Sequence, residues 1–130
     1  MKIPKFEAQT EWVKPTEFPD LRHVDEIAID LETKDPDLLK KGSGSVIGNG
    51  EVIGIAVATK HFKGYFPIAH EGGGNMDKKR VLSWLKDILE SPSTKIFHNA
   101  IYDVCWLRAM GLKINGDIAC TMIAAALTDE

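Results

Sequence analysis

The sequence has only two cysteines, Cys105 and Cys120, which form neither a CxxC pair nor part of a cysteine–histidine cluster. This pattern argues against a zinc site or a disulfide framework and favours free thiols in the reducing cytoplasm. The sequence also lacks the run of about 20 apolar residues that a membrane-spanning helix needs, and it lacks the apolar segment of a signal peptide. We therefore expect a soluble cytoplasmic protein with no membrane contact.

An excess of basic residues is also missing, since 16 Lys and Arg stand against 19 Asp and Glu and give a net charge of −3. This balance argues against a protein that coats nucleic acid through a generally basic surface. It does not exclude a nuclease, whose acidic site is neutralised by divalent metal and whose basic contacts are local. The glycines of EGGGN, residues 71–75, lack the spacing of a phosphate-binding loop and the Lys-Ser/Thr that follows it.

The composition, with 130 residues of which 44% are apolar, is that of one globular domain with a sizeable core. Residues 1–25 contain three prolines and little periodicity, which predicts an extended arm that Trp12 and Phe18 anchor on the domain surface. We expect the domain itself to occupy residues 26–130.

Hydrophobic patterning in this domain predicts alternating strands and helices. Apolar runs bounded by turn residues predict four strands, at residues 26–31, 51–59, 61–68 and 95–98. Apolar stripes and capping residues predict three helices, at residues 77–90, 99–110 and 118–127, the last largely buried. A polar loop, residues 34–50, joins the first two strands. This order predicts an α/β fold in which an antiparallel meander and a crossover strand form one mixed sheet flanked by helices.

Several aromatic and histidine side chains have a structural explanation that is simpler than a functional one. We expect the following aromatic residues in the core: Phe62, Tyr65, Phe66, Trp84 and Trp106. One of the first three could instead stack on a nucleobase. His70 and His98 are expected to end strands rather than to bind a ligand.

Two carboxylates, Asp30 and Glu32, interrupt the apolar run of the first predicted strand. Successive side chains of a strand alternate between its faces, so these two point the same way with Cα atoms about 6–7 Å apart. Two such anions 5 Å apart repel each other by roughly 3 kcal/mol at an effective dielectric constant near 20. A cation between them would relieve this repulsion, so the pair indicates half of a metal site. The alternative is the polar face of a surface edge strand.

A second acidic segment follows the fourth predicted strand. Asn99 and Asp103 are four residues apart, which places them on one face of the helix that begins there. If the strand that carries Asp30 lies beside the strand that ends at His98, the three carboxylates converge at one sheet edge. Three carboxylates and water suit hard cations such as Mg²⁺ or Mn²⁺. Taken alone, Asn99 and Asp103 could be a helix cap and a solvated acid.

Together, IAIDLET at residues 27–33 and HNAIYD at residues 98–103 resemble the first two motifs of the DEDD 3′–5′ exonucleases. The resemblance is closest to the proofreading-exonuclease domain of family-A DNA polymerases, with ribonuclease-D-like exonucleases next. The tail GLKINGDIACTMIAAALTDE, residues 111–130, is also similar to the segment that follows the second motif in those proteins. The resemblance covers residues 26–130 and implies a ribonuclease-H-like fold.

The resemblance implies a two-metal site that uses Mg²⁺ or Mn²⁺. In this arrangement Asp30 bridges both ions, Glu32 binds the ion that activates water, and Asp103 helps to hold the second ion. The implied substrate-binding residues are Leu31, Thr33 and Asn99. The implied reaction is hydrolysis of the terminal phosphodiester at a single-stranded DNA 3′ end, with release of nucleoside monophosphates. The implied context is a polymerase of phage or bacterial type, with the polymerase domain in the same full-length chain.

Two features depart from the family pattern. A third motif, Tyr or His followed by Asp, is missing downstream of the last predicted helix, so we expect a chain that stops short of it and has weak or no activity by itself. Cys120 stands where relatives often have Asp. Two alternatives stay open: a non-catalytic nucleic-acid-binding module that kept the fold, and a ribonuclease-D-like enzyme that acts on RNA.

Overall fold

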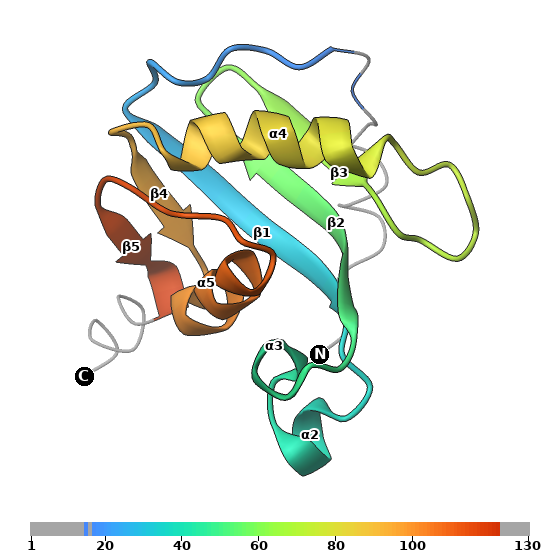
Figure 1. Cartoon of the computed structure of the whole chain (residues 1–130). Coiled ribbons are helices and arrows are strands. Elements are labelled where there is room, and N and C mark those ends of the chain that lie inside the picture. The colour runs from blue at the N-terminus through green and yellow to red at the C-terminus, as the bar shows by residue number, and fades with distance from the viewer. Residues whose placement is uncertain (1–14, 16, 123–130) are drawn as a thin grey trace.

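The computed structural model describes residue 15 and residues 17–122. A five-stranded sheet with the order β3-β2-β1-β4-β5 organises this part of the chain (Figure 1). Its strands are β1 (Glu26–Lys34), β2 (Glu51–Ala58), β3 (Lys63–Pro67), β4 (Thr94–Phe97) and β5 (Ile118–Cys120). The first three strands pair antiparallel, whereas β4 lies parallel to β1 and β5 lies parallel to β4. The predicted mixed sheet is confirmed, and β1 is its central strand rather than an edge strand.

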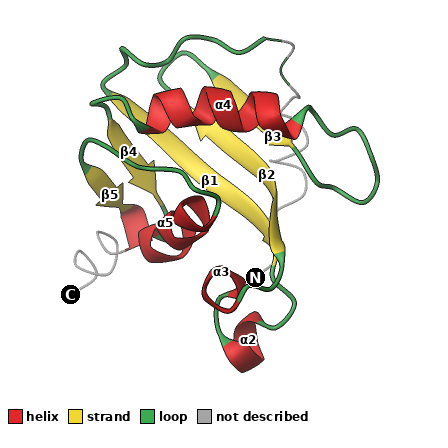
Figure 2. Ribbon diagram, in the orientation of Figure 1, coloured by secondary structure: helices red, strands yellow, loops and turns green. Residues whose placement is uncertain are grey.

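Two longer helices, α4 (Lys78–Leu89) and α5 (Ala100–Ala109), lie on one side of this sheet (Figure 2). Asp77 caps α4 as predicted, because its side chain accepts a hydrogen bond of 3.1 Å from the Lys79 amide. Asn99 precedes α5, but its side chain makes no capping hydrogen bond to any described residue. None of the helices in the described ranges is long and apolar enough to span a membrane.

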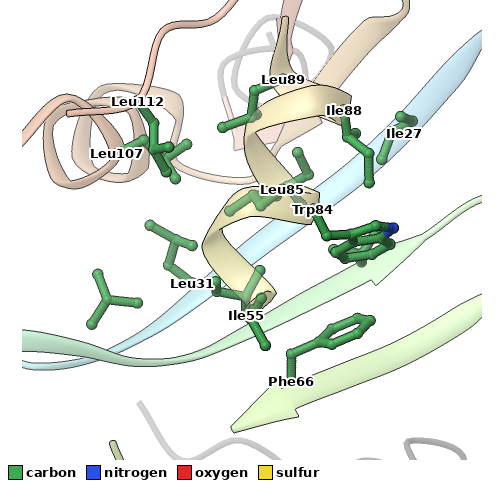
Figure 3. Close-up of a cluster of buried hydrophobic side chains, with 14 of the residues drawn as sticks. Ile27, Leu31, Ile55, Phe66, Trp84, Leu85, Ile88, Leu89, Leu107 and Leu112 are labelled. Atoms are coloured by element: carbon green, nitrogen blue, oxygen red, sulfur yellow. The ribbon is translucent and has the colours of Figure 1, made fainter. Parts of the chain in front are cut away.

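The core fills the space between α4, α5 and the covered face of the sheet (Figure 3). Ile27 and Leu31 of β1 point toward Leu85 and Ile88 of α4, and all four are buried. Because strand side chains alternate, Asp30 and Glu32 lie on the opposite face of the sheet. The apolar half of β1 therefore fixes the direction in which its two carboxylates point.

The segment that precedes β1 packs on this core. The Phe18 ring stacks on Phe66 at a centroid distance of 5.8 Å and meets Trp84 edge-on at 5.7 Å. The Trp84 indole nitrogen donates a hydrogen bond of 2.7 Å to the carbonyl of Pro19. The predicted anchoring role of Phe18 is confirmed, whereas Trp12 lies outside the described residues.

Two predictions on local structure are wrong. Ile118–Cys120, predicted as the start of a buried helix, forms the largely exposed strand β5, and residues 123–127 of that predicted helix lie outside the described ranges. The open edge of β4 supplies the hydrogen-bonding partners that decide between strand and helix in this run of small apolar residues. The predicted loop at residues 34–50 contains two four-residue helices, α2 (Leu38–Lys41) and α3 (Gly44–Ile47).

A buried lysine connects the start of β4 with the segments that precede β4 and β5. Lys95 is 0% exposed, and its ammonium group donates hydrogen bonds to the carbonyls of Ser91, Ser93 and Asn115, the last two at 2.9 and 2.8 Å. Burial lowers the pKa of this lysine, and the ring of carbonyls compensates for the water that it loses. These bonds join the end of α4 to the segment that leads into β5.

Candidate active site

Asp30 and Glu32 border a cavity of about 730 Å³ on the face of the sheet opposite α4. The polar and titratable side chains that line it come from five places in the sequence: Asp30 and Glu32, Tyr65, His70, His98, and Thr121. Alanines at positions 28, 56 and 58 form the floor and keep it open between these groups. The register of the β1–β2 ladder shifts between Glu32 and Thr33, a bulge that redirects the strand directly beside the carboxylates.

The third carboxylate, Asp103, lies in the first turn of α5 and is 3% exposed. Burial raises its pKa to about 7, the charge of Asp30 acts in the same direction, and a hydrogen bond from the Leu31 backbone opposes both. Burial also raises the pKa of Asp30, where the charge of Glu32 adds to the effect and that of His98 counteracts it. Asp30 is therefore electrostatically coupled to both other carboxylates.

Strand pairing brings these carboxylates together. β1 and β4 are parallel neighbours, with Ala28 opposite Ile96, so the two chains run toward the same end of the sheet. Asp30 lies two residues beyond Ala28 in that direction, and α5 with Asp103 begins shortly after the last residue of β4. The adjacency of the two strands, which the sequence presented only as a condition, is confirmed.

The donor chemistry of this group fits a hard divalent cation. Asp30, Glu32 and Asp103 offer only carboxylate oxygens, which Mg²⁺ and Mn²⁺ prefer, and their coupled charges favour a cation between them. Within the described residues, however, no group of three or more His, Cys, Asp or Glu side chains is close enough to hold a metal ion. Asp30 thus feels the charge of both other carboxylates, but the three do not form a metal-binding group among the described residues.

The three substrate-binding residues implied by the resemblance have different surroundings. Leu31 is 8% exposed, and because its side chain points toward α4, it lines the cavity through its backbone. Thr33 is half-buried, and its hydroxyl is hydrogen-bonded to that of Tyr102 at 2.8 Å, which ties β1 to α5. Asn99 is exposed and does not contribute to the described lining of the cavity.

Sequence reasoning missed the surroundings of Glu32. Tyr65, predicted in the core, is half-buried and lines the cavity, where its hydroxyl donates a hydrogen bond of 2.7 Å to Glu32 Oε2. Burial raises the pKa of Tyr65 far above its usual range, and the bond to Glu32 reinforces the shift, so the hydroxyl keeps its proton. His70 and His98, predicted as strand-end residues, both line the cavity as well. Phe66, Trp84 and Trp106 are buried as predicted.

With this geometry in place, comparison with known proteins decides the family. A family model described as 3′–5′ exonuclease, of the DNA polymerase A type, matches residues 16–130. The chain belongs to this exonuclease family. Membership implies dependence on a divalent metal ion, and the carboxylate oxygens of Asp30, Glu32 and Asp103 are donors of the kind that such an ion prefers.

The exonuclease chain is similar in sequence to phage DNA polymerases. It is 35% identical over 114 residues to a DNA-directed DNA polymerase of Pseudomonas phage M6, a match that covers 80% of this chain and 16% of the relative. It is 28% identical over 115 residues to DNA polymerase DpoZ of Acinetobacter phage SH-Ab 15497, covering 87% of this chain and 16% of the relative. The exonuclease chain thus spans about a sixth of the length of these relatives.

Solved nuclease structures share the fold of the exonuclease chain. Brucella melitensis NrnC with bound Mg²⁺ superposes with a TM-score of 0.58 at 21% identity, over 85% of this chain and 48% of NrnC. The EXO domain of Aedes aegypti Nibbler superposes with a TM-score of 0.57 at 13% identity, over 87% of this chain and 50% of that domain. These likenesses confirm the predicted ribonuclease-H-like fold.

Proposed function

We propose that this chain is the proofreading 3′–5′ exonuclease part of a DNA polymerase. The observation that carries the proposal is the match of residues 16–130 to the 3′–5′ exonuclease family, with Asp30 and Glu32 bordering one cavity and Asp103 buried in the helix that follows the neighbouring strand. The substrate is the 3′ end of single-stranded DNA, and each cycle releases one nucleoside monophosphate. The polymerase domain lies in the same full-length chain, by analogy with the phage relatives.

Asp30, Glu32 and Asp103 are the proposed ligands of two divalent ions, Mg²⁺ or Mn²⁺. Such a pair of ions, when bound, lowers the pKa of a water molecule and stabilises the leaving 3′ oxygen. Asp30, whose charge is coupled to those of both other carboxylates, would contact both ions, whereas Glu32 and Asp103 would each contact one. The low exposure of Asp103 keeps water away from its side of the site, which strengthens its attraction for a cation.

The cavity is the proposed site of the terminal nucleotide. Its lining combines the carboxylates at one end with the apolar floor of Ala28, Ala56 and Ala58, a surface that suits a base and sugar. Leu31 is the proposed main-chain contact, because it lines the cavity while its side chain points toward α4. Thr33 and Asn99 are proposed to contact the strand farther from the scissile bond, since neither side chain belongs to the described lining of the cavity.

The proposed domain division places the arm at residues 1–25 and the exonuclease domain at residues 26–130. The packing of Phe18 on the core supports an arm that follows the domain surface. The proposed location is the cytoplasm of a bacterial or phage-infected cell, where a phage-type polymerase replicates DNA.

An assay of the complete protein on 3′-labelled oligonucleotides tests the function. We expect Mg²⁺-dependent release of nucleoside monophosphates from single-stranded DNA, and at least a hundredfold slower release after Asp30→Asn, because this change removes a shared ligand of both ions. An Asp30→Asn protein that digests the oligonucleotide as fast as wild type contradicts the catalytic assignment. Faster digestion of the matching RNA than of DNA contradicts the proofreading role and favours the ribonuclease-D-like alternative.

A further inference from the structure

One tyrosine crosses a neighbouring strand to reach the carboxylate of Glu32. Tyr65 belongs to β3 and lies opposite Ala56 of β2, yet its hydroxyl is 2.7 Å from Glu32 Oε2 on β1, two strands away in the sheet. The side chain passes over Gly54. A Cβ atom at this glycine would lie 1.7 Å from the tyrosine oxygen and 2.3 Å from Cζ. The contact with Glu32 therefore exists only because position 54 carries no side chain.

Gly54 occupies the position in β2 that this contact requires. It is the direct partner of Glu32 in the β1–β2 ladder and of Pro67 in the β2–β3 ladder. A glycine inside a strand weakens the strand, so its presence here has a specific geometric explanation. Without a side chain at this position, the Tyr65 ring can lie across β2 and reach β1.

A histidine orients the tyrosine hydroxyl. His70 Nε2 lies 2.5 Å from the Tyr65 oxygen, and the two rings meet edge-on at a centroid distance of 5.7 Å. Asn75 holds the His70 backbone from both sides, since its side chain accepts from the His70 amide at 2.8 Å and donates to the His70 carbonyl at 2.9 Å. The loop after β3 thus fixes the position of the His70 imidazole beside the Tyr65 hydroxyl.

The proton count assigns the direction of these hydrogen bonds. A tyrosine hydroxyl has one proton, and an ionised carboxylate can only accept, so the Tyr65 proton points to Glu32. The tyrosine oxygen must then accept from His70, which requires the imidazole tautomer that carries its proton on Nε2. The result is a chain of donors from His70 through Tyr65 to Glu32 Oε2.

We propose that Tyr65 is a positioning residue that orients Glu32 for metal binding. His70 orients the Tyr65 hydroxyl, and the lack of a side chain at Gly54 leaves room for the tyrosine ring. The inference rests on the proposed function, in which Glu32 is a metal ligand. The Tyr65 hydroxyl donates its hydrogen bond to Oε2 of Glu32. No described residue donates a hydrogen bond to Oε1 of Glu32, so this second oxygen is available to the cation. Groups that orient a metal ligand in this way typically contribute about 10–100-fold to metal affinity or activity.

Mn²⁺ titration of the chain by isothermal calorimetry tests the inference. Tyr65→Phe removes only the hydroxyl, and we expect it to weaken Mn²⁺ binding by about tenfold or more. His70→Gln keeps an amide donor and should retain most of the affinity, whereas His70→Leu should lose as much as Tyr65→Phe. Thr59→Val is the matched control, because it deletes a hydroxyl from the β2–β3 turn that accepts only the exposed amide of His61 among described groups.

Nitrogen-15 NMR of the His70 ring provides a readout that a general loss of stability does not move. We expect the Nε2-protonated tautomer in the metal-free wild type and a mixture of tautomers in Tyr65→Phe, since the acceptor that selects the tautomer is gone. A wild-type ring protonated on Nδ1 alone would contradict the proposed direction of the donor chain.

Asp30→Asn separates failure of the inference from failure of the proposed function. If Asp30→Asn abolishes Mn²⁺ binding while Tyr65→Phe binds like wild type, the positioning role is wrong and the metal site stands. If neither change weakens binding, or if the wild-type chain binds no Mn²⁺, the proposed metal site is itself wrong and the inference falls with it.

Discussion

Asp103 is a carboxyl group that folding forces into a nearly water-free position. Its pKa of about 7 in the folded chain compares with an ordinary value of 3.8, because burial and the charge of Asp30 disfavour ionisation. Between these two values the unfolded chain has released the proton and the folded chain still binds it. The contribution of Asp103 to the free energy of unfolding is therefore highest below pH 4 and falls as the pH rises toward 7, as long as no metal ion is bound.

Asp103→Asn should consequently stabilise the metal-free protein, and more so at high pH. Urea unfolding in excess chelator should show a gain in the free energy of unfolding at pH 8 that exceeds the gain at pH 4.5 by about 3 kcal/mol, since the unfolded carboxyl is already largely ionised at pH 4.5. Asp87→Asn on the exposed side of α4 is the control for the change in net charge. Equal gains at both pH values would show that Asp103 is not the group that titrates.

Individual site residues differ in how far the sequence reveals them. Asp30 and Glu32 could be predicted because strand alternation fixes their common face, and Asp103 because helical spacing relates it to Asn99. Tyr65 could not, since alternation gives the face of a side chain but not its reach across a neighbouring strand. The one sequence signal was Gly54, a glycine inside an apolar strand, which can mark the close approach of another group.

At the scale of elements, Gly54 makes the spacing of β1, β2 and β3 part of the site. Gly54→Ala should displace the Tyr65 ring, reduce the free energy of unfolding by about 1–3 kcal/mol through overpacking, and weaken Mn²⁺ binding as Tyr65→Phe does. In a Tyr65→Ala background the added methyl group should have little further effect, because the ring that it meets is gone. Gly72→Ala is the control, since a Cβ atom there has nothing within 4 Å. Additive effects of Gly54→Ala and Tyr65→Ala would contradict this packing.

The segment between β1 and β2 is anchored to α5 through Asp35. Its carboxylate accepts hydrogen bonds from the Gly44 amide at 3.0 and 3.1 Å and from the Tyr102 hydroxyl at 2.8 Å. Asp35→Ala should speed hydrogen exchange at the Gly44 amide and lower the free energy of unfolding by about 1 kcal/mol, the usual net contribution of an intramolecular hydrogen bond. Asp37→Ala, which removes only a bond to the Asn49 side chain among described groups, should leave the exchange at Gly44 nearly unchanged. Equal acceleration in both variants would contradict the anchoring role of Asp35.

The elements that sequence patterns did not predict are those that tertiary contacts decide. The β2–β3 hairpin and α4 follow from local alternation, turn residues and the Asp77 cap, and the structure confirms them. α2 and α3 have four residues each, too few for a helical period to appear. β5 depends on the open edge of β4, so the same short apolar run is a strand in this fold and would suit a helix elsewhere.

Across the whole molecule, two tyrosine hydroxyls secure the acidic segment of β1 from opposite sides. Tyr65 reaches Glu32 from β3, and Tyr102 reaches Thr33 from α5. The bulge between Glu32 and Thr33 separates the two contacts. The parallel pairing of β1 with β4 then brings Asp103 to the same segment. The acidic site is thus fixed by elements from both halves of the described chain, which couples its geometry to the stability of the fold.

This coupling predicts that divalent metal stabilises the entire domain. Because an ion that binds only the folded chain adds RT ln(1 + [L]/Kd), Mn²⁺ at a hundred times its Kd should add about 2.7 kcal/mol. For a domain of this size the melting temperature should rise by roughly 10 °C. Differential scanning calorimetry of wild type and Asp30→Asn, each with Mn²⁺ or with chelator, measures the effect. The rise should disappear in Asp30→Asn and persist in Asp87→Asn, since Asp30 is a proposed metal ligand whereas Asp87 lies on the exposed side of α4. A rise of equal size in Asp30→Asn would place the stabilising ion outside the acidic site of β1.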